Sequence, residues 1–335
     1  MYRYRYILGG EMNRRAGILA LVALSAVSFT AVAQQPTKVW RIGVLETTDM
    51  AANSANLNGF RQGMMQLGYV EGRNYVIEYR SAGGSAERFP KLAAELAGLK
   101  VDLILARGTP AAIAASKVSP VIPVVTPAIA VPLLVVASLA RPGGNVTGLT
   151  AINSELQGKL VQLLREILPR IARIAALQNM GNPAVVPAWK EFESVAQTLG
   201  IQPLLLDVRK QEDLGPALER AARQRAEAVI VGADGLAAAN GKLIVKLANE
   251  HRLPTIFRSR EYVQAGGLMS YGVIYPDLYR RAASYIDRIF KGAKPGDLPM
   301  EQPIAFELVI NLNTAKALGI TIPQSVLLRA DEVIQ

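Results

Sequence analysis

The sequence contains no cysteine and only one histidine among its 335 residues. Without cysteine there can be no disulfide, no thiolate metal site, no cysteine nucleophile and no cysteine to carry a lipid anchor. The single histidine, His251, stands where a helix is expected to end before Leu253-Pro254, and we interpret it as a helix cap rather than a catalytic residue. Both absences argue against a metal site.

Sequence motifs for catalysis are missing as well. There is no Gly-x-Ser-x-Gly nucleophile elbow, no Gly-x-x-x-x-Gly-Lys-Ser/Thr phosphate loop and no His-Glu-x-x-His metal motif. We therefore expect binding rather than catalysis, with no cofactor, no metal and no catalytic residue.

Aromatic residues make up 6% of the chain, whereas hydrophobic residues make up half of it. A composition rich in alanine, leucine and valine suits helices packed on parallel sheets. The formal charge is +10, but the basic residues are scattered and form no run. Since nucleic-acid binding needs a clustered basic face, we expect no nucleic-acid partner and interpret the surplus as a solvated surface.

The N-terminus has the pattern of a secretory signal. Arg14 and Arg15 precede eighteen uncharged residues, 16–33, which end in Ala-Val-Ala. A positive start, an apolar core and a small-x-small end predict a cleavable signal peptide over residues 1–33, with Met12 as the more natural start. An uncleaved N-terminal anchor is the alternative. Cleavage predicts a soluble protein exported to the periplasm.

From residue 39 onward, strand patterns alternate with helix patterns, which predicts α/β architecture with parallel sheets. Pro142-Gly143-Gly144 interrupts the alternation, which then starts again. Proline ends the preceding run and the glycines permit a tight turn. Residues 146–152 could then cross from one lobe to a second, with a ligand between the lobes. Alternatively, the turn lies inside one large sheet.

In a parallel sheet, ligands bind where the strands end at their carboxyl side. Arg107 and Thr109 follow one predicted strand, and Pro110 could open a helix there. Free backbone N–H groups, the hydroxyl and the guanidinium would suit a carboxylate or phosphate. Alternatively, Thr109 only caps the helix and Arg107 is a solvated surface residue. Asp234 could pair with a ligand amine or turn its loop, and Tyr271 and Tyr275 could stack on a ligand or pack between lobes.

Several stretches resemble one family. The chain is similar to bacterial ABC transporter substrate-binding proteins of the tryptophan/tyrosine-binding-like group, which have the type I periplasmic binding protein fold. The matching stretches are residues 60–63 (Phe-Arg-Gln-Gly), 67–74 (Leu-Gly-Tyr-Val-Glu-Gly-Arg-Asn), 77–80, 108–112 (Gly-Thr-Pro-Ala-Ala), 137–148 (Ala-Ser-Leu-Ala-Arg-Pro-Gly-Gly-Asn-Val-Thr-Gly), 265–272, 306–311 and 329–334.

The resemblance implies a two-lobe protein that closes on a small solute and delivers it to an inner-membrane permease, as a monomer. It implies an N-terminal lobe of residues 37–148 plus 275–310 and a C-terminal lobe of 149–272 plus 313–335. Three hinge crossovers are expected, near residues 146–152, 271–275 and 311–314. Ligand contacts are implied for Thr47, Thr48, Thr109, Asn179, Asp234 and Tyr271.

Two departures from the family pattern concern the expected cleft. An Asp-Pro pair that is common in the family is replaced by Ile129-Ala130, and Arg107 replaces a small residue. Losing an acid and gaining a base would shift preference from an amine towards a carboxylate. We therefore expect an amino-acid-like solute or a small carboxylate, and hypothesise that an aromatic amino acid is not bound in the usual way. The alternative is an exported ligand-sensing or docking protein with no link to transport.

Overall fold

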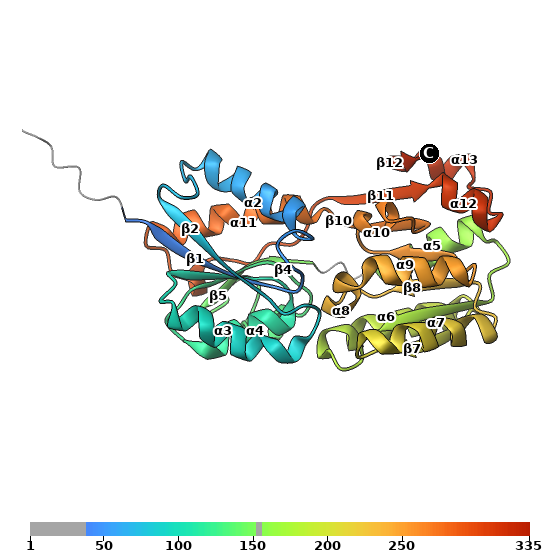
Figure 1. Cartoon of the computed structure of the whole chain (residues 1–335), viewed down its shortest axis with the longest axis horizontal. Helices are drawn as coiled ribbons and strands as arrows, with labels where there is room; N and C mark the ends of the chain where they lie inside the picture. Colours follow the sequence, from blue (N-terminus) through green and yellow to red (C-terminus); the bar gives the residue numbers. More distant parts are fainter. Residues whose placement is uncertain (1–37, 152–155) are drawn as a thin grey trace, which may run out of the picture. The chain divides into compact units, whose positions relative to one another are not determined.

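Figure 1 shows the computed structural model, which describes residues 38–151 and 156–335. Residues 39–335 form one compact unit. The predicted signal peptide, residues 1–33, lies outside the described residues. Within the described ranges, no helix is long and apolar enough to cross a membrane.

The first sheet has five strands, and all of its strand pairs are parallel. Its central strands are buried on both faces, which explains why they read as continuous apolar runs such as Leu-Ile-Leu-Ala. In spatial order the strands are β2 (Tyr75–Ser81), β1 (Trp40–Glu46), β3 (Leu103–Ala106), β4 (Val124–Ile129) and β5 (Val146–Thr150).

Two helix pairs cover this sheet. On one face lie α2 (Ser54–Gln66) and α11 (Tyr275–Phe290), and on the other lie α3 (Phe89–Gly98) and α4 (Thr109–Val118) (Figure 1). The α2–α11 pair is unusually close, because a Cβ at Gly59 would lie 2.3 Å from the carbonyl oxygen of Pro276. Glycine at this position lets a helix from the last quarter of the chain pack onto the first sheet. We call the sheet with these four helices the first lobe.

The second sheet has seven strands. All of its pairs are parallel except β10–β11, which is antiparallel. In spatial order the strands are β12 (Glu332–Ile334), β11 (Phe306–Asn311), β10 (Met269–Val273), β9 (Thr255–Phe257), β8 (Ala228–Val231), β6 (Arg173–Gln178) and β7 (Gln202–Asp207).

The helices of the second sheet also cover both faces, and with the sheet they form what we call the second lobe. On one face lie α5 (Leu156–Ile167), α6 (Val186–Thr198), α12 (Leu312–Leu318) and α13 (Gln324–Leu327); on the other lie α7 (Leu214–Arg223), α8 (Gly235–Ala239) and α9 (Gly241–Glu250), with α10 (Arg260–Gln264) beside β10. Short 3₁₀ turns lie at η1 (Ala86–Arg88), η2 (Pro132–Leu134), η3 (Pro183–Val185), η4 (Gln211–Asp213) and η5 (Pro295–Asp297).

The α/β fold with two sheets flanked by helices confirms the expected class. One placement differs: residues 306–310, expected in the first lobe, pair antiparallel with β10 in the second sheet. After α11 the chain still follows the first sheet, where Glu301 bridges to Leu149. The last crossing therefore falls at residues 302–305, not at 311–314, where Asn311 instead caps α12. The other lobe boundaries stay predictions.

Candidate functional site

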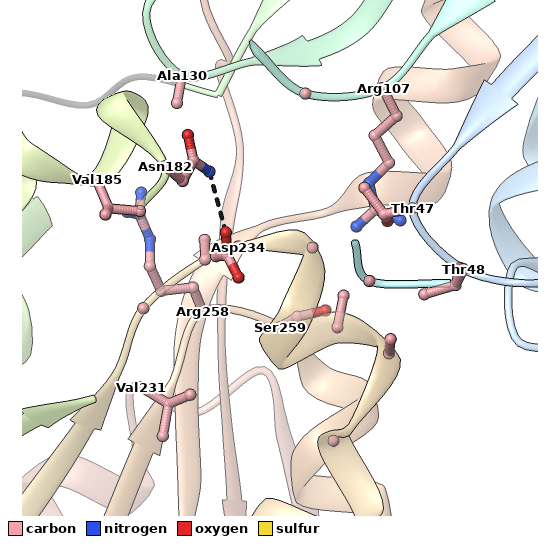
Figure 2. Close-up of a pocket in the computed structure, with 18 of the residues that line it drawn as sticks. Thr47, Thr48, Arg107, Ala130, Asn182, Val185, Val231, Asp234, Arg258 and Ser259 are labelled. Atoms are coloured by element: carbon pink, nitrogen blue, oxygen red, sulfur yellow. Dashed lines mark hydrogen bonds between the residues drawn. The ribbon is translucent and has the colours of Figure 1, made fainter. Parts of the chain in front are cut away.

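A cavity of about 1090 Å³ is lined by residues from the carboxyl ends of strands in both sheets. This is where parallel sheets are expected to present ligand-binding loops. Figure 2 shows part of the lining, with Thr47, Thr48 and Arg107 from the first lobe and Asn182, Asp234 and Arg258 from the second.

Three loops of the first lobe form one wall. Thr47 and Thr48 follow β1, and the backbone oxygen of Thr48 accepts a hydrogen bond from Tyr79 Oη at 2.7 Å. Thr109 is buried, and its hydroxyl accepts the backbone N–H of Val131 at 3.1 Å. That bond braces the loop after β3 against the loop after β4, so the hydroxyl is not a helix cap. These two hydrogen bonds thus tie the loop after β1 to β2 and the loop after β3 to the loop after β4.

Arg107 is a half-buried residue of the cavity wall rather than a solvated surface arginine. Its side chain is 16% exposed, its Nη1 lies 3.9 Å from Glu46 Oε2, and its guanidinium lies 4.4 Å from the centre of the Tyr275 ring. Burial would lower the pKa of Arg107, but the charge of Glu46 helps to raise it overall. The guanidinium therefore stays charged where it faces the cavity.

Glu46 supports Arg107 from beneath and is almost fully buried. Its carboxylate accepts the hydroxyl of Tyr279 and the backbone N–H of Thr47, the latter at 3.1 Å. Burial raises the pKa of Glu46 to about 7, although Arg107 and the Thr47 N–H act in the opposite direction. An ionisable group thus lies directly behind the cavity wall.

Asp234 is the acidic centre of the opposite wall. It caps α8, with Oδ1 accepting the backbone N–H of Leu236 at 2.7 Å. Its Oδ2 accepts the side-chain amides of Asn182 at 3.0 Å and Asn179 at 3.3 Å. Asp234 therefore holds its own loop in shape, which was one of the two interpretations of this residue from the sequence. It also lines the cavity, so the other interpretation, contact with a ligand amine, stays a prediction.

Not every predicted site residue reaches the cavity. Thr47, Thr48, Arg107, Thr109 and Asp234 line it, and their role in ligand binding stays a prediction. Asn179 stands behind Asp234, outside the lining. Tyr271 packs against Phe306, with ring centres 6.0 Å apart, at the core of the second lobe, whereas Tyr275 lines the cavity.

The loop after β4 carries the departure noted in the sequence. Ile129 is fully buried in the core beneath α3 and α4, while Ala130 lines the cavity. At this place the wall therefore offers a methyl group and no carboxylate.

A model of the ABC transporter substrate binding protein family matches residues 41–334. The chain belongs to this family. Among curated proteins, it is 25% identical to a tyrosine-binding protein of Clostridioides difficile, over 83% of this chain and 80% of that one.

Solved structures agree with this assignment. A conserved domain protein from Vibrio cholerae is 28% identical, with a TM-score of 0.83, over 88% of this chain and all of that one. An ABC domain from Streptococcus pneumoniae, solved in complex with L-tryptophan, is 27% identical, with a TM-score of 0.81, over 89% of this chain and all of that one. The predicted type I periplasmic binding protein fold and the predicted family are thus confirmed.

Sequence reasoning missed several lining residues of this substrate-binding protein. Arg258 follows β9 directly, as Arg107 follows β3, so the rule of strand ends would have found it if applied to residues 255–257. Asn182 and Glu191 come from the loop and helix after β6, and Tyr262 comes from α10. Asn182 belongs to a loop at the carboxyl end of a strand, where ligands were expected, but it was not chosen as a site residue. No local pattern points Glu191 and Tyr262 towards the cavity, because their placement depends on how α6 and α10 pack.

The two walls touch beside the cavity. A Cβ at Gly84, in the loop after β2, would lie 2.8 Å from the Cβ of Ala239 in α8. A Cβ at Gly235 would likewise lie 3.2 Å from the Thr47 side chain. Glycines on both sides therefore permit backbone of the first lobe to approach α8. Among the residues that the structure describes, no group of acidic or histidine side chains could hold a metal ion.

Proposed function

We propose that this protein is the exported solute-binding subunit of an ABC importer. It holds a small solute bearing a carboxylate in the cavity and delivers it, as a monomer without catalysis of its own, to an inner-membrane permease. Family membership supports the transport role, and the predicted signal peptide supports export.

The choice of a carboxylate as the solute's binding group rests on the position of Arg107. Its guanidinium lies in a half-buried wall of the cavity, and the nearest acid, Glu46, is 3.9 Å away, too far for a hydrogen bond. The planar N–H groups of arginine match a carboxylate in a bidentate arrangement. Arg107 is thus suited to hold the acid of the solute against the first lobe.

The relatives suggest that the solute can also carry an amine. One is a tyrosine-binding protein, and another was solved with L-tryptophan. Asp234 supplies the negative charge that an ammonium group would contact. Since Ile129-Ala130 replaces an Asp-Pro pair that is common in the family, we place the carboxylate contact, rather than the amine contact, first.

Thermal unfolding of the purified protein with amino acids, small carboxylates, nucleosides and purines would test this proposal. A ligand at about one hundred times its dissociation constant should add about 2.7 kcal/mol of stability. We expect a carboxylate to raise the melting temperature of the wild type and not that of Arg107→Ala. Arg80→Ala, which removes an arginine paired with Glu95 outside the cavity, should keep the response.

Two results would contradict the proposal. One is a melting temperature that no compound of the panel raises. The other is a response to aromatic amino acids alone that survives Arg107→Ala, because the carboxylate anchor would then lie elsewhere. Cells lacking the protein should also fail to take up the identified carboxylate.

A further inference from the structure

Two half-buried arginines differ from all the other half-buried arginines in the described ranges. Arg107 and Arg258 donate no side-chain hydrogen bond to any described residue. The other half-buried arginines each donate at least one, to a carboxylate, a side-chain amide or a backbone carbonyl: Arg61, Arg80, Arg173, Arg260, Arg281 and Arg288. Both exceptions line the same cavity.

The backbone of Arg258 is held in place from below. Gly272 of β10 passes so close that a Cβ there would lie 2.1 Å from the carbonyl oxygen of Arg258. Phe257, the preceding residue, is fully buried. In Figure 2, the side chain extends past Asp234 towards Asn182 and Val185, while Arg107 enters from the other side of the view. The arginine thus starts from a fixed point of the second lobe.

Among the described residues, the acids near Arg258 form no ion pair with it. Glu191 of α6 is near enough for its charge to act on Arg258, but the two side chains are not paired. Asp234 already accepts three hydrogen bonds from its own lobe. Burial lowers the pKa of Arg258, and the nearby Tyr275 and Glu191 offset this only in part. Among the described residues, this half-buried guanidinium therefore has no acid that forms an ion pair with it.

We propose that Arg258 forms a second anion subsite, so that the solute is a small diacid held between Arg107 of the first lobe and Arg258 of the second. This rests on the proposed function, which places one carboxylate at Arg107. Each guanidinium would donate two parallel N–H groups to one carboxylate. A solute that joins the two arginines also joins the two lobes, which explains why one arginine belongs to each wall.

Binding of diacids and their monoamides by calorimetry tests the subsite. The pairs are succinate with succinamate, glutarate with glutaramate, and phthalate with phthalamate, because each pair differs by one charge at nearly equal size. We expect at least one diacid to bind the wild-type protein about tenfold or more tightly than its monoamide. Arg258→Gln should reduce that ratio to about one, because it weakens binding of the diacid more than binding of the monoamide. Arg223→Gln, on the exposed face of α7, removes the same charge outside the cavity and should keep the ratio.

The outcomes separate this inference from the function on which it rests. Monoamides that bind as tightly as diacids, with affinity lost in Arg107→Ala, would overturn the second subsite and keep the first. A diacid preference that survives Arg258→Gln would also overturn it. Failure of all six compounds to bind, with an amino acid bound in a way that depends on Arg107, would overturn the second subsite and keep the first. Failure of these six compounds and of the whole thermal-unfolding panel would overturn both.

Discussion

Glu46 should make the stability of this protein depend on pH in an unusual direction. Its carboxyl group is almost fully buried behind Arg107, and burial raises its pKa from about 4.5 to about 7. Between these two pH values the folded protein keeps a proton on Glu46 that the unfolded chain has lost. Because the folded state binds more protons there, the free energy of unfolding falls as pH rises. The stabilisation is fully present below about pH 4.5 and is lost as pH rises through about 7.

The magnitude follows from the difference between the two pKa values. Each pKa unit corresponds to about 1.4 kcal/mol, so the full effect is about 3 kcal/mol. Between pH 5 and pH 8, about 2.5 kcal/mol of this falls within the measured range. Glu46→Gln cannot ionise and removes this contribution. The wild-type protein should therefore lose about 2.5 kcal/mol more than the variant over that interval.

Urea unfolding at pH 5, 6, 7 and 8 measures the effect through the extrapolated free energies. Glu219→Gln serves as the control, because Glu219 is an exposed residue of α7, and this variant should follow the wild-type curve. If Glu46→Gln and the wild type show parallel pH dependence, Glu46 does not hold a proton in the folded state and the reasoning fails.

Two further predictions concern glycines. Gly84→Ala should weaken binding of the tightest compound found by about tenfold in calorimetry, because the added Cβ would hold the lobes apart at α8. Gly72→Ala is the control, because Gly72 has nearly the same φ (+81° against +83°) and its Cβ would meet no atom within 4 Å. This control should keep the affinity. Equal losses in both variants would attribute the effect to backbone strain. Gly148→Ala should lower the free energy of unfolding in urea by about 3 kcal/mol or more, because the added Cβ would lie 2.2 Å from a carbonyl oxygen of β4. Gly144→Ala is the control and should hardly change this free energy, because a Cβ there meets open space. A Gly148→Ala variant as stable as the wild type would contradict the prediction.

Much of the fold followed from the sequence because strands buried on both faces need continuous apolar runs, and helices between them need a 3.6-residue period. The break at Pro142 precedes β5, the last strand of the first sheet along the chain, and the crossing expected after it stays a prediction. What local patterns could not show was pairing direction. The run 306–311 looks like any other strand, and only its partner β10 makes it antiparallel and places it in the second lobe.

For the candidate site, too, the sequence predicted some features and only the tertiary structure decided the others. Strand order and the motif stretches placed Arg107, Thr109 and Asp234 at one edge of their sheets, because loops after parallel strands gather there. The sequence by itself also determined that the site would contain no thiol and no histidine cluster. Only tertiary structure decided which of these side chains face the cavity and what they contact. The pairing of Arg107 with Glu46, and the absence of an ion pair between Arg258 and any described acid, depend on distances between segments far apart in the chain. No local pattern of residues encodes these distances.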